Sequence, residues 1–175
     1  RLKLLELAQK YNFLIIEDAV YNSFTYAQKR NPTLKSLDKF NRVIYVGSFS
    51  KSLFPGLRLG LIGADQKIEN EAGEIVPLID EMCKVKAQLT NNTSSISQAI
   101  LGGVLLNLNY SLSEWNKPKF ESYKKKQDQM IKALATHFNL TENPWAKGIS
   151  WNEPEGGFFI KMTVPFSVDV KSVME

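Results

Sequence analysis

The sequence predicts an α/β fold, in which the strands of a sheet alternate with helices that cross over it. Short apolar runs rich in branched residues occur at 13–16, 42–48 and 57–64. Stretches with helical spacing or turn signals separate these runs, as crossover connections require. With 175 residues, of which 43% are hydrophobic, the chain is about the size of one domain and can bury a core.

The composition narrows the classes of protein that need to be considered. The 22 basic and 18 acidic residues give a net charge of +4, which is too small and too scattered to indicate nucleic-acid binding. Cys83 is the one cysteine, so an internal disulfide is excluded and a reducing, cytoplasmic location is expected. No apolar run approaches the roughly 18 residues of a membrane span, so no membrane contact is expected.

The first half of the chain supplies the predicted sheet. Residues 1–10 have the pattern of an amphipathic helix already under way, without an initiator methionine, so we expect the chain to begin within a longer protein. The strand predicted over "YNFLIIED", residues 11–18, contains the first apolar run and ends in Glu17 and Asp18. Strand alternation turns these two carboxylates to opposite faces, so they do not form a paired acid/base site.

The second half is predicted to be mostly helical. A small hairpin turning near Gly73 precedes a helix over "LIDEMCKVKAQL", and Thr93 or Ser94 is expected to cap the apolar helix that follows. A long helix over 117–138 carries three consecutive lysines, 124–126, on a solvated face. Two glycines then lead into a strand predicted at 158–162, in a second and smaller domain.

The segment "GSFSKSLFPGLRLG", residues 47–60, concentrates chemistry at the end of a predicted strand. Lys51 follows the strand directly, where α/β folds place ligand chemistry. A desolvated lysine near another cation can form a Schiff base with a carbonyl group, and Arg58 can be that cation. The guanidinium of Arg58 and the hydroxyls of Ser48 and Ser50 suit a phosphate group.

A lysine for an aldehyde and an arginine for a phosphate together imply pyridoxal 5'-phosphate. The ring of this cofactor withdraws electrons well only when its nitrogen stays protonated, so an acid is expected at a neighbouring strand end. Asp18 fits that position. Tyr21, three residues further on, can hydrogen-bond the phenolic oxygen of the ring if the chain turns there.

"EDAVY" followed by "GSFSKSLFPGLRLG" resembles the class I/II, aspartate-aminotransferase-like enzymes of fold type I. The seven-residue step from Lys51 to Arg58 is similar to the branch of aminoadipate and kynurenine aminotransferases and MocR-type regulators. The resemblance implies that Asp18 pairs with the pyridine nitrogen and Tyr21 contacts the ring oxygen. It also implies that Lys51 holds the aldehyde and serves as acid/base catalyst, and that Arg58, Ser48 and Ser50 hold the phosphate.

The family resemblance also sets expectations for architecture. It implies a mostly parallel large-domain sheet with helices on both faces, followed by the start of a smaller α+β domain. The expected parts are the C-terminal portion of the cofactor-binding domain at 1–112, an interdomain helix at 113–138 and the small domain from 139 to 175. The chain is then less than half of the family's usual length, and the full protein is expected to be a homodimer.

Three classes of function stay open. The favoured one is transamination between an amino acid and a 2-keto acid through Lys51. The second is another reaction, such as decarboxylation or a lyase reaction, on the same cofactor scaffold. The third is a non-catalytic sensor domain of a MocR-type transcription regulator. None of these assigns a metal ion, and the substrate cannot be identified from these residues.

Overall fold

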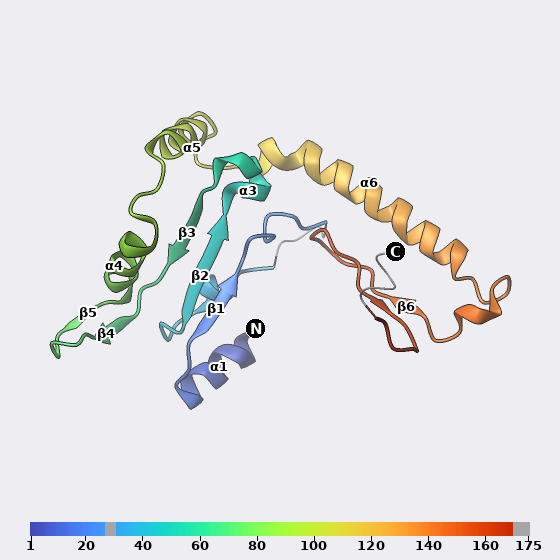
Figure 1. Ribbon diagram of the computed structural model, residues 1–175, viewed down its shortest axis with the longest axis horizontal. Coiled ribbons are helices and arrows are strands. Elements are labelled where there is room, and N and C mark those ends of the chain that lie inside the picture. Colours follow the sequence, from blue (N-terminus) through green and yellow to red (C-terminus); the bar gives the residue numbers. More distant parts are fainter. Residues whose placement is uncertain (27–30, 170–175) are drawn as a thin grey trace. The chain divides into compact units, whose positions relative to one another are not determined.

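The computed structural model describes residues 1–26 and 31–169, which belong to two compact units (Figure 1). Of the described residues, 1–23 and 31–116 form the first unit, and 24–26 and 117–169 form the second. The functional division predicted at 112 and 138 stays a prediction. Within the described ranges, no helix has both the length and the apolar character needed to cross a membrane.

The first unit contains a three-stranded sheet of β1 (Ile15–Asp18), β2 (Val43–Ser48) and β3 (Gly60–Gly63), in that order (Figure 1). β1 runs parallel to β2, and Asp18 lies opposite Val46. β3 runs antiparallel to β2. The parallel pair places the carboxyl ends of β1 and β2 at the same edge of the sheet.

The first strand begins later than predicted, at Ile15. Helix α1 (Leu2–Tyr11) ends at Asn12, whose φ of 55° is left-handed and whose amide donates to the carbonyl of Ala8. The amide of Phe13 donates to the same carbonyl at 3.1 Å. Phe13 therefore completes the helix end, and the strand predicted at 11–18 is corrected to Ile15–Asp18, with the predicted end confirmed.

The strand predicted at 57–64 is also shorter in the structure. A 3-10 turn, η1 (Pro55–Leu57), precedes it, and Arg58 then adopts a left-handed φ of 51°. Because this conformation cannot extend a strand, β3 starts only at Gly60. The preceding "loop" contains one helical turn, α3 (Phe49–Ser52).

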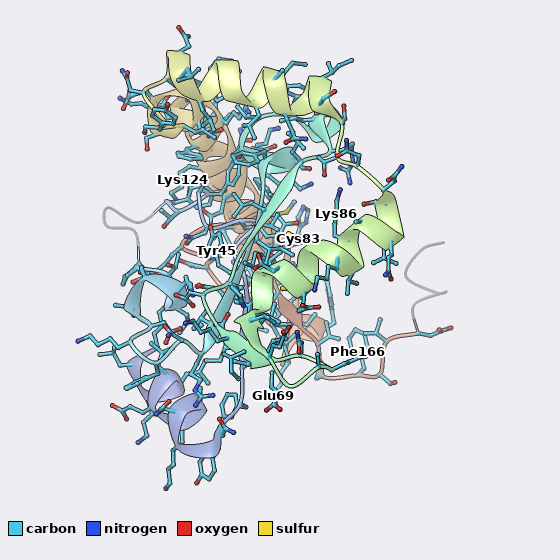
Figure 2. All side chains as sticks on the ribbon, turned by 90° about the vertical axis from the view of Figure 1, so that its left-hand side faces the viewer. Tyr45, Glu69, Cys83, Lys86, Lys124 and Phe166 are labelled. Carbon is cyan, nitrogen blue, oxygen red and sulfur yellow. The ribbon has the colours of Figure 1, made fainter. Side chains whose placement is uncertain are left out.

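The predicted hairpin and the two helices after it are present. β4 (Lys67–Glu69) pairs antiparallel with β5 (Ile75–Pro77), and Gly73 has the positive φ of 79° that the turn requires. Helix α4 (Leu78–Thr90) follows, with Cys83 and Lys86 exposed on it (Figure 2). Helix α5 (Ser95–Asn107) is capped by Ser94, whose hydroxyl accepts from the amide of Ser97.

One buried apolar cluster of the first unit lies within the segment that carries Lys51. Leu53, Leu57 and Leu59 are 6%, 2% and 5% exposed and form one buried cluster. Partly buried side chains from α3, from α5 and from the residue just before the next helix pack against it: Phe49, Leu101, Val104 and Leu112. The apolar residues of the segment thus hold it onto α5, while Lys51 and Arg58 are exposed and Ser52 is buried.

The second unit is built around aromatic side chains. Helix α6 (Ser113–His137) contributes Phe120 and Tyr123, whose rings lie 5.2 and 6.1 Å from that of Phe24. Phe158 lies 4.6 Å from both Phe24 and Tyr123. A 3-10 turn, η2 (Pro144–Ala146), and the short pair β6 (Ser150–Trp151) and β7 (Met162–Thr163) complete this unit.

The strand predicted at 158–162 is wrong apart from Met162. The residues before it pair instead with the segment at 24–26: the amide of Tyr26 donates to Glu155 and that of Gly157 to Phe24, both at 2.7 Å. A Cβ added to Gly156 would lie 2.3 Å from the carbonyl oxygen of Phe24, so the two backbones touch there. Gly157 then turns with a φ of 79°, which ends the extended run and directs Phe158 into the aromatic cluster.

Candidate active site

The candidate site begins at the shared carboxyl edge of β1 and β2. Asp18 is the last residue of β1 and Ser48 the last of β2. Asp18 pairs with Val46, and Ser48 follows Val46 by two residues, so strand alternation places all three side chains on one face. Asp18 is exposed, and its carboxylate accepts from the amide of Val20 at 3.1 Å.

Lys51 stands on the helical turn that follows β2 immediately. The hydroxyl of Ser48 caps this turn by accepting from the amide of Ser50 at 3.1 Å. The amide of Phe49 donates to the carbonyl of Leu59 at 3.0 Å, which ties the turn to the strand that returns. Lys51 itself is exposed on this anchored turn, so its amine is available to a ligand.

Arg58 returns toward the same turn because of its unusual backbone. Its φ of 51° and ψ of 39° are left-handed, a conformation that costs a non-glycine residue about 1–2 kcal/mol. One guanidinium nitrogen donates to the hydroxyl of Ser50 at 3.4 Å and to the carbonyl of Pro55 at 3.2 Å. This strained residue therefore brings a cation beside the Ser50 hydroxyl, one residue before Lys51.

Tyr21 lies in the turn that follows β1. The amide of Asn22 donates to the carbonyl of Ala19 at 3.0 Å, which reverses the chain around Tyr21. The Tyr21 side chain is 36% exposed. The chain thus turns where a contact from Tyr21 to a ligand next to Asp18 would require it.

The structure gathers the six predicted residues at two neighbouring strand ends of one sheet. Ser48, Ser50, Lys51 and Arg58 lie on the segment after β2, and Asp18 and Tyr21 lie at the end of β1. In its chemistry this donor set fits a cofactor with both a carbonyl group and a phosphate: a primary amine, a guanidinium next to a hydroxyl, and a carboxylate. Within the described ranges, no group of three or more His, Cys, Asp or Glu side chains could hold a metal ion.

One participant in this region was missed by sequence reasoning. Glu17, which faces away from Asp18, accepts hydrogen bonds from the amides of Leu34 and Lys35 at 2.8 and 2.9 Å. The turn signal "NPTL" marked the position of these amides in the sequence. Nothing in the local pattern, however, connects them to a carboxylate 17 residues earlier.

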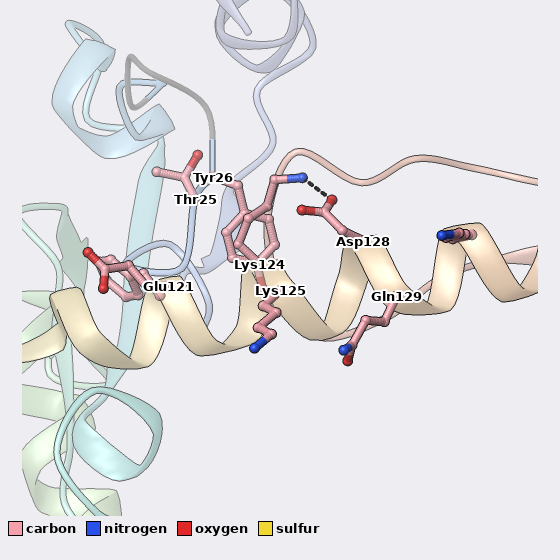
Figure 3. Close-up of a pocket in the computed structure, with 9 residues that line it drawn as sticks. Thr25, Tyr26, Glu121, Lys124, Lys125, Asp128 and Gln129 are labelled. Carbon is pink, nitrogen blue, oxygen red and sulfur yellow. Dashed lines mark hydrogen bonds and ion pairs between the residues drawn. The ribbon is translucent and has the colours of Figure 1, made fainter.

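A separate cavity of about 640 Å³ lies in the second unit (Figure 3). Thr25, Tyr26 and side chains along α6 line it, among them Lys124 and Asp128, which form an ion pair. The three lysines at 124–126 are exposed, which confirms that they form a solvated helix face. Acidic and basic groups mix here, so this cavity lacks the arrangement of amine, guanidinium and carboxylate found at the strand ends.

Comparison with known proteins identifies the family. The family model "Aminotransferase class I and II" matches residues 2–170, and the chain belongs to this family. The chain is 40% identical over 170 residues to an (S)-3,5-dihydroxyphenylglycine transaminase of Amycolatopsis orientalis, a match that covers 97% of this chain and 36% of that protein. The resemblance inferred from the two motifs is therefore confirmed.

Solved structures confirm the fold. The chain superimposes on a multiple substrate aminotransferase from Thermococcus profundus with a TM-score of 0.81 and 35% identity, covering 98% of this chain and 38% of that one. A kynurenine aminotransferase of Pyrococcus horikoshii, solved with PMP, gives 0.75 and 32%, covering 97% and 37%. The chain has the fold of these enzymes and spans less than two-fifths of their length.

A regulator is also among the relatives. The HTH-type transcriptional regulator NorG of Staphylococcus aureus is 27% identical over 164 residues, which cover 94% of this chain and 33% of NorG. Aminotransferases and a regulator thus share the part of the sequence that this chain represents.

Proposed function

We propose that this chain is part of a pyridoxal 5'-phosphate-dependent aminotransferase that moves an amino group between an amino acid and a 2-keto acid. The observation that carries the proposal is Lys51, exposed on a capped helical turn directly after β2, with Arg58 folded back toward Ser50. The identity to a named transaminase supports the same activity. When bound, the cofactor supplies an aldehyde for the lysine and an electron-withdrawing ring.

Each residue has a role that its position supports. Lys51 anchors the aldehyde and, once released, moves a proton to and from the substrate carbon. Asp18, on the face shared with Ser48, keeps the ring nitrogen protonated, and Tyr21 hydrogen-bonds the ring oxygen. Arg58 binds the phosphate in the bidentate geometry of a guanidinium, with the hydroxyls of Ser48 and Ser50 as further partners.

Chemical trapping tests the assignment of Lys51. The natural protein that carries this chain is saturated with cofactor, reduced with borohydride, digested and mapped by mass spectrometry. We expect the pyridoxyl group on the peptide that contains Lys51. An adduct on a different lysine, or no adduct at all, would contradict the proposal.

A product assay distinguishes transamination from the two alternative functions, which are another reaction on the same cofactor and a non-catalytic sensor. A panel of amino acids with 2-oxoglutarate or pyruvate shows whether amino groups are exchanged; release of CO₂ or ammonia instead would indicate a decarboxylase or lyase. The similarity to NorG favours a sensor as the second candidate. A sensor would bind cofactor and amino acid but exchange no amino group, and its gene would encode a DNA-binding region.

The same proposal includes assembly and location. We propose a homodimer in the cytoplasm, with the functional parts divided at 112 and 138. Helix α5 supports an assembled state because it is largely apolar, yet Ile96 and Leu106 are 73% and 63% exposed in this chain. Sedimentation of the natural protein tests it: a monomer at micromolar concentration would contradict the dimer.

A further inference from the structure

Glu17 makes contacts that its place in the sequence does not suggest. It is half-buried on the face of β1 opposite to that of Asp18. One carboxylate oxygen accepts from the amide of Leu34 at 2.8 Å, and the other accepts from the amide of Lys35 at 2.9 Å. Both oxygens are thus directed at the backbone of a segment far along the chain.

The two amides are the first of helix α2 (Leu34–Leu37). The next amide, that of Ser36, donates to the hydroxyl of Thr33 at 2.9 Å. Amides in the first turn of a helix have no partner within the helix, and here Glu17 and Thr33 together supply three acceptors. The short helix is therefore fixed to β1 by Glu17, and Thr33 caps its N-terminus.

Helix α2 in turn holds the start of β2. The ammonium of Lys35 donates to the carbonyl of Val43 at 2.9 Å, and the amide group of Gln66 donates to the same oxygen at 3.0 Å. Val43 is the first residue of β2 and lies opposite Ile15 in the sheet. Glu17, α2 and Lys35 thus form a second connection between the two strands, beside their backbone ladder.

This connection bears on the neighbouring residue. β1 is four residues long, and the amide of Ala19, which donates to Val46 at 2.8 Å, closes its ladder just after Asp18. Adjacent strand residues face opposite sides, so a side chain that is fixed below the sheet sets the direction of the one above it. A carboxylate held through both oxygens is a more directional anchor than apolar packing would be.

We propose that Glu17 is a positioning residue, which holds the end of β1 so that Asp18 points toward the ring nitrogen of the cofactor. Glu17 touches neither substrate nor cofactor. The inference rests on the proposed function of Asp18, because that function gives the direction of Asp18 its importance.

Three variants of the natural protein separate the possible causes. Glu17→Gln keeps the shape but places an amide group against a backbone N–H, so one hydrogen bond is lost. Glu17→Asp keeps the charge next to Asp18 but is too short to reach both amides. Thr33→Ala is the matched control, because it removes a cap from the same helix without touching β1.

The first measurement needs no cofactor. Hydrogen exchange of the Ala19 amide in cofactor-free protein reports how firmly the end of β1 is held. We expect exchange about tenfold faster in both Glu17 variants and unchanged in Thr33→Ala. Equal protection of Ala19 in all three variants would overturn the positioning role.

The second measurement uses cofactor-loaded protein. We expect kcat about tenfold lower in both Glu17 variants, with little change in KM. We also expect the pH midpoint of the absorbance of bound cofactor to rise by about one unit, since a less firmly protonated ring repels a nearby proton less. Normal activity in Glu17→Asp with loss in Glu17→Gln would assign the effect to charge and overturn the inference. If the wild type binds no cofactor, the proposed function fails, while the hydrogen-exchange result still tests whether Glu17 holds the end of β1.

Discussion

The two units of the chain differ in the kind of contact that stabilises each one internally. Around the strand ends of the first unit, charged side chains bind backbone groups: Glu17 accepts from two amides, and Asp38 accepts from three. In the second unit, Phe24 is 2% exposed among three other rings. Hydrogen bonds fix direction and aromatic packing contributes mainly buried area, so the contacts of Glu17 and Asp38 orient the strands, whereas the rings around Phe24 mainly bury surface.

The largest effect is expected from Lys51→Arg. The guanidinium cannot form the covalent link or transfer the proton, so turnover should fall by about 10³-fold or more. Because Lys51 is exposed, the free energy of unfolding should change by less than about 0.5 kcal/mol. The exposed Lys39 provides the control Lys39→Arg, which should leave both quantities unchanged; substantial turnover in Lys51→Arg would remove the lysine from the mechanism.

Phe24→Ala should show the opposite pattern. Removing a buried aromatic ring costs about 3–5 kcal/mol, so the melting temperature should fall steeply. The turnover of each molecule that remains folded, measured against bound cofactor, should stay near that of the wild type. Phe166→Ala, at a residue 62% exposed, is the control and should be nearly neutral. A small effect of Phe24→Ala would mean that the aromatic cluster is not the core of its unit.

Asp18→Ala and Arg58→Ala should affect different quantities, the first the turnover and the second the affinity for the cofactor. Asp18→Ala should still bind cofactor but lose about 10²-fold in turnover, because the ring nitrogen loses its anionic partner. Arg58→Ala should weaken cofactor affinity by about 10- to 100-fold through the loss of charged hydrogen bonds. Titration of each apoprotein with cofactor, followed by kinetics at saturation, separates the two effects. Normal turnover of Asp18→Ala at saturation would refute the assigned role.

The smallest effect is expected from Asp38→Asn, and it is largest near neutral pH and disappears in acid. Partial burial raises the pKa of Asp38, but hydrogen bonds from the amides of Phe40, Val43 and Arg42 and the nearby Lys35 ammonium outweigh it and hold the pKa below its ordinary value of 3.8. A lowered pKa in the folded state adds stability above the ordinary value, and this stability disappears as pH falls through the folded-state pKa. Wild-type stability should therefore fall more steeply below about pH 4 than that of Asp38→Asn. If chemical denaturation gave the same slope of unfolding free energy against pH for both proteins in acid, this prediction would be contradicted.

The local sequence pattern was sufficient to predict an element where the residues of one segment determine that segment's structure. Branched apolar residues predicted β2, Gly73 marked the hairpin, and the run of periodic residues predicted most of α6. The site residues could be selected because the chemistry of lysine, arginine and aspartate at strand ends is distinctive. The roles assigned to them remain predictions.

The sequence pattern gave wrong or incomplete predictions where contacts with a distant backbone segment determine the local structure. The residues around Phe158 look like a strand, but the preceding residues are already paired with the segment around Tyr26, and Gly157 then turns the chain away. Glu17 was overlooked for the same reason, since its partners lie at 34 and 35. Contacts across such separations depend on the completed fold and leave no periodic signal.

Gly156 lies where two backbones touch, and this contact limits how the protein can evolve. Any side chain there would meet the carbonyl oxygen of Phe24 at 2.3 Å and the Cα of Thr25 at 2.9 Å. Both obstacles are backbone atoms, which cannot rotate aside as a side chain can. Any other residue at this position would therefore push apart two backbone segments that lie some 130 residues apart in the chain. A library randomised at Gly156 and selected for folded protein should return glycine alone, whereas Gly102, with open space around it, should accept alanine.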